Sequence, residues 1–178
     1  MRSRVLRALM ALVVLAGFQL LTAPGASASP YCGITWGSQP RAAGTGAPAG
    51  SYGGVSTGQH DCYDRLVVRT DAPVSSWAVR YADGLGEWAP GGAQLEVTVG
   101  AGYGVSHTWL FHYPLAQVPS YRTFRSLVAG SASEVRTSVW LGVRARLPFR
   151  AFVLPGPGAG SRLVVDVAHE WCTTGTTC

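Results

Sequence analysis

Two copies of the tetrapeptide Arg-Leu-Val-Val, at 65–68 and at 162–165, constrain the fold more than any other feature of the sequence. Each copy runs from arginine into β-branched residues, a composition that favours a β-strand. The stretches 76–81 and 94–99 alternate apolar and polar side chains, which is typical of strands with one buried face. No segment between the two copies has a convincing helical period, and only 120–130 leaves room for a short helical turn. The pattern therefore predicts an all-β fold.

A longer alternation runs from Val135 to Phe149, where every odd position except Thr137 is apolar. Typical strands have about 5–6 residues, so we expect a break near Gly142 or Pro148, because proline is tolerated only at sheet edges and bulges. About seven short strands with regular turns predict a sandwich or a closed barrel. Of these we expect the sandwich, with two sheets of short antiparallel strands and long loops.

The first 28 residues have the pattern of a secretory signal. An arginine-rich start precedes the apolar run 8–21, and Ala26-Ser27-Ala28 fits a cleavage site before Ser29. A retained membrane anchor is the alternative, but the run is short for a bilayer span. We expect a secreted protein with no stable span after cleavage.

The remaining chain, about 150 residues, is long enough for one domain. Residues 29–58 are rich in glycine and proline, and we expect a loop-rich segment tied back by a disulfide. Residues 59–171 hold the strand patterns and predict the β-sandwich domain. Residues 172–178 form a short cysteine-containing tail.

Four cysteines occur in the chain, at Cys32, Cys62, Cys172 and Cys178. An even number in an exported protein favours disulfides, and three connectivities are possible. We favour Cys32–Cys62 with Cys172–Cys178. The alternative is that Cys178 is free or pairs with a cysteine of another chain. A zinc site is less favoured because no CxxC pair exists, and we expect no metal and no cofactor.

The charge of the chain excludes several functions. The net charge of +5 includes three arginines of the signal, so the mature chain is only weakly basic and nucleic acid is not an expected partner. The chain has no lysine, which excludes a Walker-type phosphate loop and a Schiff-base lysine.

The flanks of the two tetrapeptides hold the polar side chains with the greatest chemical potential. They are His60, Asp61, Asp64, Asp166 and His169. If the two strands are neighbours, these flanks approach one another and can form an acid–base pair or a metal site. The alternative is that aspartate and arginine simply pair across strands. The G-x-S-x-G pattern at 54–58 follows a glycine-rich loop rather than a strand, so we treat it as accidental.

Two further groups are candidates for ligand binding. Arg144, Arg146 and Arg150 occupy even positions in the alternating stretch or directly after it. They would form a row that binds carboxylates or phosphates. The alternative is that they form a solubilising outer face. The loop 100–119 carries aromatic side chains that can stack on sugars or insert into a partner, or else belong to the core. The candidates in this loop are Tyr103, Trp109 and Tyr113.

The segments 31–37, 60–68, 141–150 and 162–169 together resemble the exported AMIN-like domain proteins of bacteria. The related AMIN domain is the localisation module of cell-wall amidases, a two-sheet β-sandwich that acts through peptidoglycan. The resemblance implies a non-catalytic binding or localisation module with no catalytic residues to transfer. It departs from the family pattern at 131–135, where only Glu134 is kept.

We therefore expect an envelope module that contacts peptidoglycan, an anionic wall polymer or an envelope protein. The first alternative is a small secreted hydrolase or metal-dependent wall enzyme that uses His60, Asp61, Asp166 or His169. The second is a module that binds a protein partner through the aromatic loop 100–119.

Overall fold

The computed structural model describes residues 31–84, 87–103 and 113–171. No helix occurs in these ranges. The strands are β1 (Arg41–Ala43), β2 (Tyr52–Gln59), β3 (Tyr63–Thr70), β4 (Trp77–Tyr81), β5 (Ala93–Val99), β6 (Phe124–Ala132), β7 (Thr137–Val143), β8 (Phe149–Pro155) and β9 (Ser161–Ala168). In the part of the chain that the structure describes, no helix is long and apolar enough to cross a membrane.

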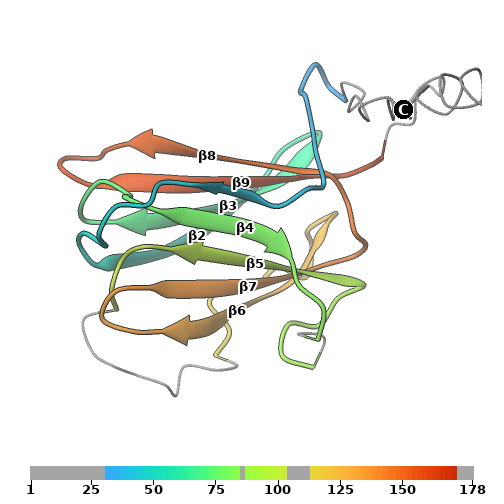
Figure 1. The fold of residues 1–178 in the computed structure, drawn as a ribbon. Helices are drawn as coiled ribbons and strands as arrows, with labels where there is room; N and C mark the ends of the chain where they lie inside the picture. The colour runs from blue at the N-terminus through green and yellow to red at the C-terminus, as the bar shows by residue number, and fades with distance from the viewer. Residues whose placement is uncertain (1–30, 85–86, 104–112, 172–178) are drawn as a thin grey trace, which may run out of the picture.

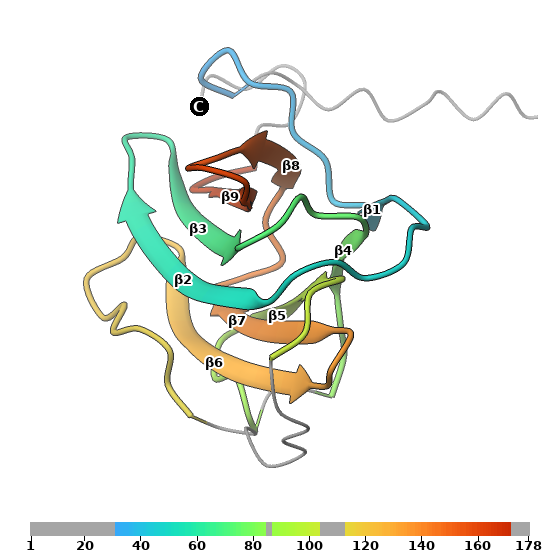
Figure 2. The same cartoon turned by 90° about the vertical axis from the view of Figure 1, so that its left-hand side faces the viewer.

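The strands form two antiparallel sheets that lie face to face (Figures 1 and 2). One sheet has the order β1-β4-β5-β7-β6, and the other has the order β2-β3-β9-β8. The sheets do not close into a barrel. The predicted two-sheet sandwich is therefore confirmed.

The two Arg-Leu-Val-Val copies are neighbours at the centre of the four-stranded sheet. They lie on β3 and β9, which pair in the antiparallel sense with Leu66 opposite Val165 and Val68 opposite Leu163. These four side chains are fully buried and face the other sheet. Removing such side chains from water stabilises the fold by about 1.5–3 kcal/mol each. The repeat is thus a pair of central core strands.

The long alternation from Val135 to Phe149 is interrupted, as predicted. Strand β7 ends at Val143 in the five-stranded sheet, and β8 begins at Phe149 in the four-stranded sheet. Residues 144–148 carry the chain from one sheet to the other, because Pro148 cannot donate a hydrogen bond within a continuous ladder.

The loop-rich segment 29–58 also contains strands, because β1 and most of β2 lie in it and pair with β4 and β3. Gly54 has a φ of +93° at the irregularity between Tyr52 and Val55, so glycine here serves a bulge in a strand. The segment 120–130 forms most of β6 rather than a helical turn, because its backbone pairs with β7.

A disulfide joins Cys32 to Cys62, as predicted, with their Cα atoms 6.4 Å apart. It fastens the segment 31–37 to the start of β3, and Trp36 from this segment is buried. Cys172 and Cys178 lie outside the described residues.

Candidate functional site

A polar cleft of about 330 Å³ opens at the end of the sandwich where β3 begins and β9 ends. The pairing of these strands brings the two flanks of the repeat together. The cleft is lined by Gln59, His60, Asp61, Asp64, Ser120, Arg122 and His169. Four of the five residues in the predicted polar cluster therefore meet at this cleft.

The floor of the cleft is a buried aspartate–histidine pair. Asp64 lies on the inner face of β3, and its Oδ1 is 3.1 Å from Nε2 of His169. Its Oδ2 accepts backbone N–H bonds from Thr123 at 2.6 Å and from Phe124 at 3.2 Å. The pair therefore connects β3 and β9 to the start of β6 in the opposite sheet.

Both ring nitrogens of His169 are engaged. Nδ1 lies 3.2 Å from the carbonyl oxygen of Asp61, which only accepts, so Nδ1 carries a proton. Nε2 faces the Asp64 carboxylate, and the side chain of His169 is only 1% exposed. No lone pair of this imidazole is directed toward the cleft, so the geometry fits a structural lock better than a general base or a metal ligand.

The exposed wall of the cleft carries hydrogen-bonding groups and charges of both signs. His60 stacks on Tyr63 with 4.5 Å between ring centroids, and Asp61 is exposed beside it. Gln59 donates to the carbonyl of Ser120 at 2.7 Å. Arg122 is exposed and only 3.7 Å from Glu170. These groups are accessible to a ligand, whereas the pair at the floor is not.

Asp166 does not join this cleft, so the predicted five-residue cluster divides into two. Register places Asp166 between Arg65 and Arg150 on the outer face of the four-stranded sheet. Arg65 donates to both carboxylate oxygens, at 2.6 and 2.9 Å, and Arg150 donates at 2.8 Å. The hydrogen bond with Asp166 raises the pKa of Arg65. Asp166 therefore pairs with arginines across strands, which was the alternative to its taking part in an acid–base or metal site.

Aromatic rings surround these two guanidinium groups. Tyr63 and Phe152 lie within 6 Å of both, and Trp36 from the disulfide-linked segment lies 5.5 Å from the guanidinium of Arg150. Such cation–π contacts add to the ion pairs when the groups are sheltered from water. The arrangement fixes the segment 31–37 against the sheet.

The three arginines that share one parity do not form a row on one strand. Arg144 and Arg146 lie in the connection 144–148, whereas Arg150 lies on β8 and binds Asp166. Arg144 donates to the carbonyl of His169, and the guanidinium of Arg146 lies 4.8 Å from the ring of Tyr81. The crossover between sheets breaks the row, because parity is preserved only along one strand. Arg144 and Arg146 remain exposed at the same end of the sandwich as the cleft.

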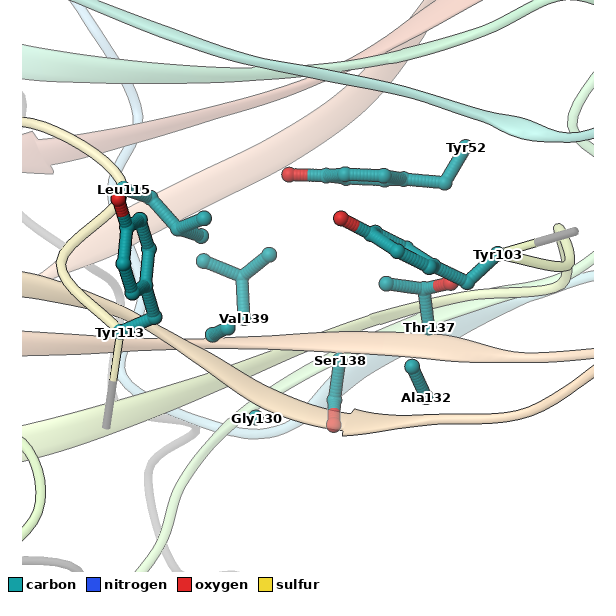
Figure 3. Close-up of a pocket in the computed structure, with 10 residues that line it drawn as sticks. Tyr52, Tyr103, Tyr113, Leu115, Gly130, Ala132, Thr137, Ser138 and Val139 are labelled. Atoms are coloured by element: carbon teal, nitrogen blue, oxygen red, sulfur yellow. The ribbon is translucent and has the colours of Figure 1, made fainter. Parts of the chain in front are cut away.

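Tyr103 and Tyr113 meet at a second, smaller pocket (Figure 3). Tyr52 from β2 lies beside Tyr103, with 5.5 Å between ring centroids. Trp109 lies outside the described residues. Sequence reasoning missed Tyr52, because it stands in a glycine-rich stretch and only strand pairing places it here.

The G-x-S-x-G pattern lies on β2, an edge strand. A nucleophile elbow must connect a strand to a helix. Within the described ranges no helix follows Ser56, so the pattern has a strand context and not that of a hydrolase elbow. Nor do the described residues contain a group of three or more His, Cys, Asp and Glu placed to hold a metal ion.

A family model for the AMIN-like domain matches residues 50–169. The chain belongs to the AMIN-like domain family. The match spans both sheets from β2 to β9 and begins before residue 59, the expected start of the domain. AMIN-like domains occur in envelope proteins, so membership supports association with the cell envelope. The chain matches no curated protein.

The tyrosines predict how the AMIN-like domain responds to alkali. Burial raises the pKa of Tyr52 from an ordinary 10.0 to about 12, and burial also raises the pKa of Tyr81, whose hydroxyl donates to the Leu147 carbonyl. Below pH 10 both phenols are neutral in the folded and unfolded states, so their ionisation does not lower the free energy of unfolding. Above pH 10 the unfolded phenols ionise first, so the free energy of unfolding falls as pH rises.

Urea unfolding at pH 8, 10, 11 and 12 checks this expectation. In Tyr81→Phe the fall above pH 10 should be shallower by up to about 1.4 kcal/mol per pH unit. Equal slopes for the wild type and this variant would contradict it.

Proposed function

We propose that this AMIN-like domain is a non-catalytic, exported module that binds peptidoglycan at the cell envelope. The observation that carries the proposal is the polar cleft. Its accessible wall bears charges of both signs, whereas the buried side chains at its floor are hydrogen-bonded to one another and to the backbone. Family membership supports the envelope setting. The secretory pattern of residues 1–28 agrees with an exported protein.

The chemistry of the cleft suits the peptide stems of peptidoglycan, which carry carboxylates and amines. Arg122 is exposed at the cleft, and Arg144 is tied to His169 at its floor. Arginine binds carboxylate with two parallel hydrogen bonds, which makes such contacts strong and directional. Asp61, exposed on the same wall, offers a partner for an amine.

A wall enzyme is the competing function, and the geometry favours binding over it. A general base needs a free lone pair within reach of substrate. His169 has none directed to the cleft, and Asp166 is committed to two arginines on another face. His60 is accessible, but among the described residues no carboxylate is hydrogen-bonded to it.

Retention on purified, insoluble peptidoglycan at physiological salt tests the proposal. The wild type should be retained, and the double variant Arg122→Ala/Arg144→Ala should bind at least about ten-fold more weakly, because two charge-assisted contacts are lost. The matched control is Arg41→Ala/Arg136→Ala. It removes the same charge from exposed residues on β1 and in the β6–β7 turn. The β6–β7 hairpin places Arg136 at the opposite end from Arg122 and Arg144.

Thermal unfolding of both double variants establishes that each is folded before retention is compared. The proposal fails if the wild type is not retained, or if the control variant loses retention as strongly as the cleft variant.

A further inference from the structure

The second pocket lies between β2 and the β6–β7 hairpin, toward the end of the sandwich away from the polar cleft. Its walls include the apolar side chains of Leu115, Ala132 and Val139. Figure 3 shows the rings of Tyr52 and Tyr103 side by side, with the Tyr52 hydroxyl directed into the space bounded by Leu115 and Val139. The pocket is therefore an apolar space with a phenol at its edge.

The Tyr52 hydroxyl distinguishes this pocket from a packing defect. The oxygen is buried and has no hydrogen-bond partner among the described residues. The hydroxyls of Thr137 and Ser138 in the lining are paired: Thr137 donates to the Ala101 carbonyl at 2.9 Å, and Ser138 donates to the Ser131 carbonyl at 3.0 Å. An unpaired buried hydroxyl destabilises a fold, so its presence here points to a partner supplied from outside.

The ionisation of Tyr52 is compatible with a donor role. Burial raises its pKa to about 12, so the phenol stays neutral and keeps its proton at physiological pH. A neutral phenol donates one hydrogen bond, for which a carbonyl oxygen is a suitable acceptor.

The size of the pocket limits what can enter. Its volume is about 40 Å³. A water molecule needs roughly 10–15 Å³ on this measure, so the pocket has room for about three non-hydrogen atoms. An acetyl group has this size: its methyl would contact Leu115 and Val139, and its oxygen would accept from Tyr52.

Aromatic side chains at the pocket are available to the rest of such a ligand. Tyr113 is 69% exposed and Tyr103 is 36% exposed. Rigid, amphipathic tyrosine rings offer an apolar face and a polar edge at little cost in conformational entropy. A sugar ring attached to the acetyl group would find an apolar surface and hydroxyl partners there.

We propose that this pocket binds the N-acetyl group of an amino sugar in a glycan strand. The inference rests on the proposed function, since it identifies the acetylated glycan as a part of peptidoglycan that the module contacts. The acetyl group enters the apolar space and accepts a hydrogen bond from Tyr52. Tyr103 and Tyr113 contact the sugar ring outside it.

Calorimetric titration with the tetramer of N-acetylglucosamine tests this site directly. The tetramer should bind, whereas its de-N-acetylated and N-butyryl counterparts should bind at least about ten-fold more weakly, because one lacks the acetyl group and the other exceeds the space. Tyr52→Phe should weaken tetramer binding about five-fold through the loss of one hydrogen bond, with a Tm equal to or above that of the wild type.

The matched control is Tyr121→Phe, which removes a tyrosine hydroxyl bonded to Thr57 at 2.9 Å outside this pocket. It should leave tetramer binding unchanged. The inference is overturned if the tetramer does not bind, if the three tetramers bind alike, or if Tyr52→Phe binds as the wild type does.

Retention on insoluble peptidoglycan separates this inference from the proposed function. Retention without tetramer binding would overturn the acetyl site and leave the proposed function standing. Tetramer binding that obeys the acetyl and Tyr52 dependence, without retention, would support the site and overturn the proposed function.

Discussion

Replacing Asp64 with alanine should lower the free energy of unfolding by about 3–5 kcal/mol, because three buried groups lose the carboxylate to which they are hydrogen-bonded. The variant leaves the His169 imidazole without its carboxylate. It also leaves the N–H groups of Thr123 and Phe124 without an acceptor. All these groups are buried, so water does not readily replace the lost partner. Urea unfolding at pH 7 measures the loss.

Asp61→Ala is the matched control for this prediction. Asp61 also lines the cleft and carries the same charge, but its side chain is exposed. Only its backbone carbonyl meets His169, and this survives the substitution. Loss of the Asp61 side chain should change the free energy of unfolding by no more than about 0.5 kcal/mol. Similar losses for Asp61→Ala and Asp64→Ala would show that the buried pair is not a structural lock.

The strands of the core could be predicted because their signal is local. Leu66 and Val68 alternate with polar residues, and the same period marks residues 94–99. Burial of one face selects this pattern wherever a strand covers a core. The strand at residues 52–59 was not predicted. It contains three glycines, so its composition resembles a linker, and backbone pairing with β3 holds it in place.

The division of the polar cluster could not be predicted, because it depends on register. Asp64 and Arg65 are adjacent in sequence and therefore point to opposite faces of the sheet. Pairing of Arg65 with Asp166 places that aspartate on the outer face, whereas Asp64 points inward to His169. A shift of one residue would reverse these assignments. The local alternation indicates which face each side chain takes, but it does not show that these two strands pair or which of their residues lie opposite each other.

The same reasoning applies to the candidate binding residues. The predicted arginine row relied on alternation along the chain, but Arg150 lies on β8 in the other sheet and binds Asp166. Tyr103 and Tyr113 were found from composition, yet their partner Tyr52 lies some 50 residues earlier in the chain and joins them only through the fold. Side chains at a site are local in space, and sequence patterns report only what is local in the chain.

The second large effect should follow from Asp166→Ala. The substitution leaves the guanidinium groups of Arg65 and Arg150 facing each other across β9 without the carboxylate that separates them. Asp166 is fully buried, and the two arginine side chains are 25% and 29% exposed. We expect a loss of about 3–5 kcal/mol in the free energy of unfolding, because repulsion is added to the loss of three hydrogen bonds and one further ion-pair contact around one carboxylate.

Glu96→Ala is the control that separates this effect from ordinary loss of an ion pair. Glu96 pairs with Arg80 at 2.5 Å, but that arginine is 56% exposed. Loss of this ion pair should therefore lower the free energy of unfolding by only about 0–1 kcal/mol. Replacing Asp166, Arg65 and Arg150 together with apolar residues should recover much of the stability, because a buried ion triad can be exchanged for packing when no charge is left behind. If Asp166→Ala costs no more than Glu96→Ala, or if the triple variant is no more stable than Asp166→Ala, the two arginines do not depend on the carboxylate between them.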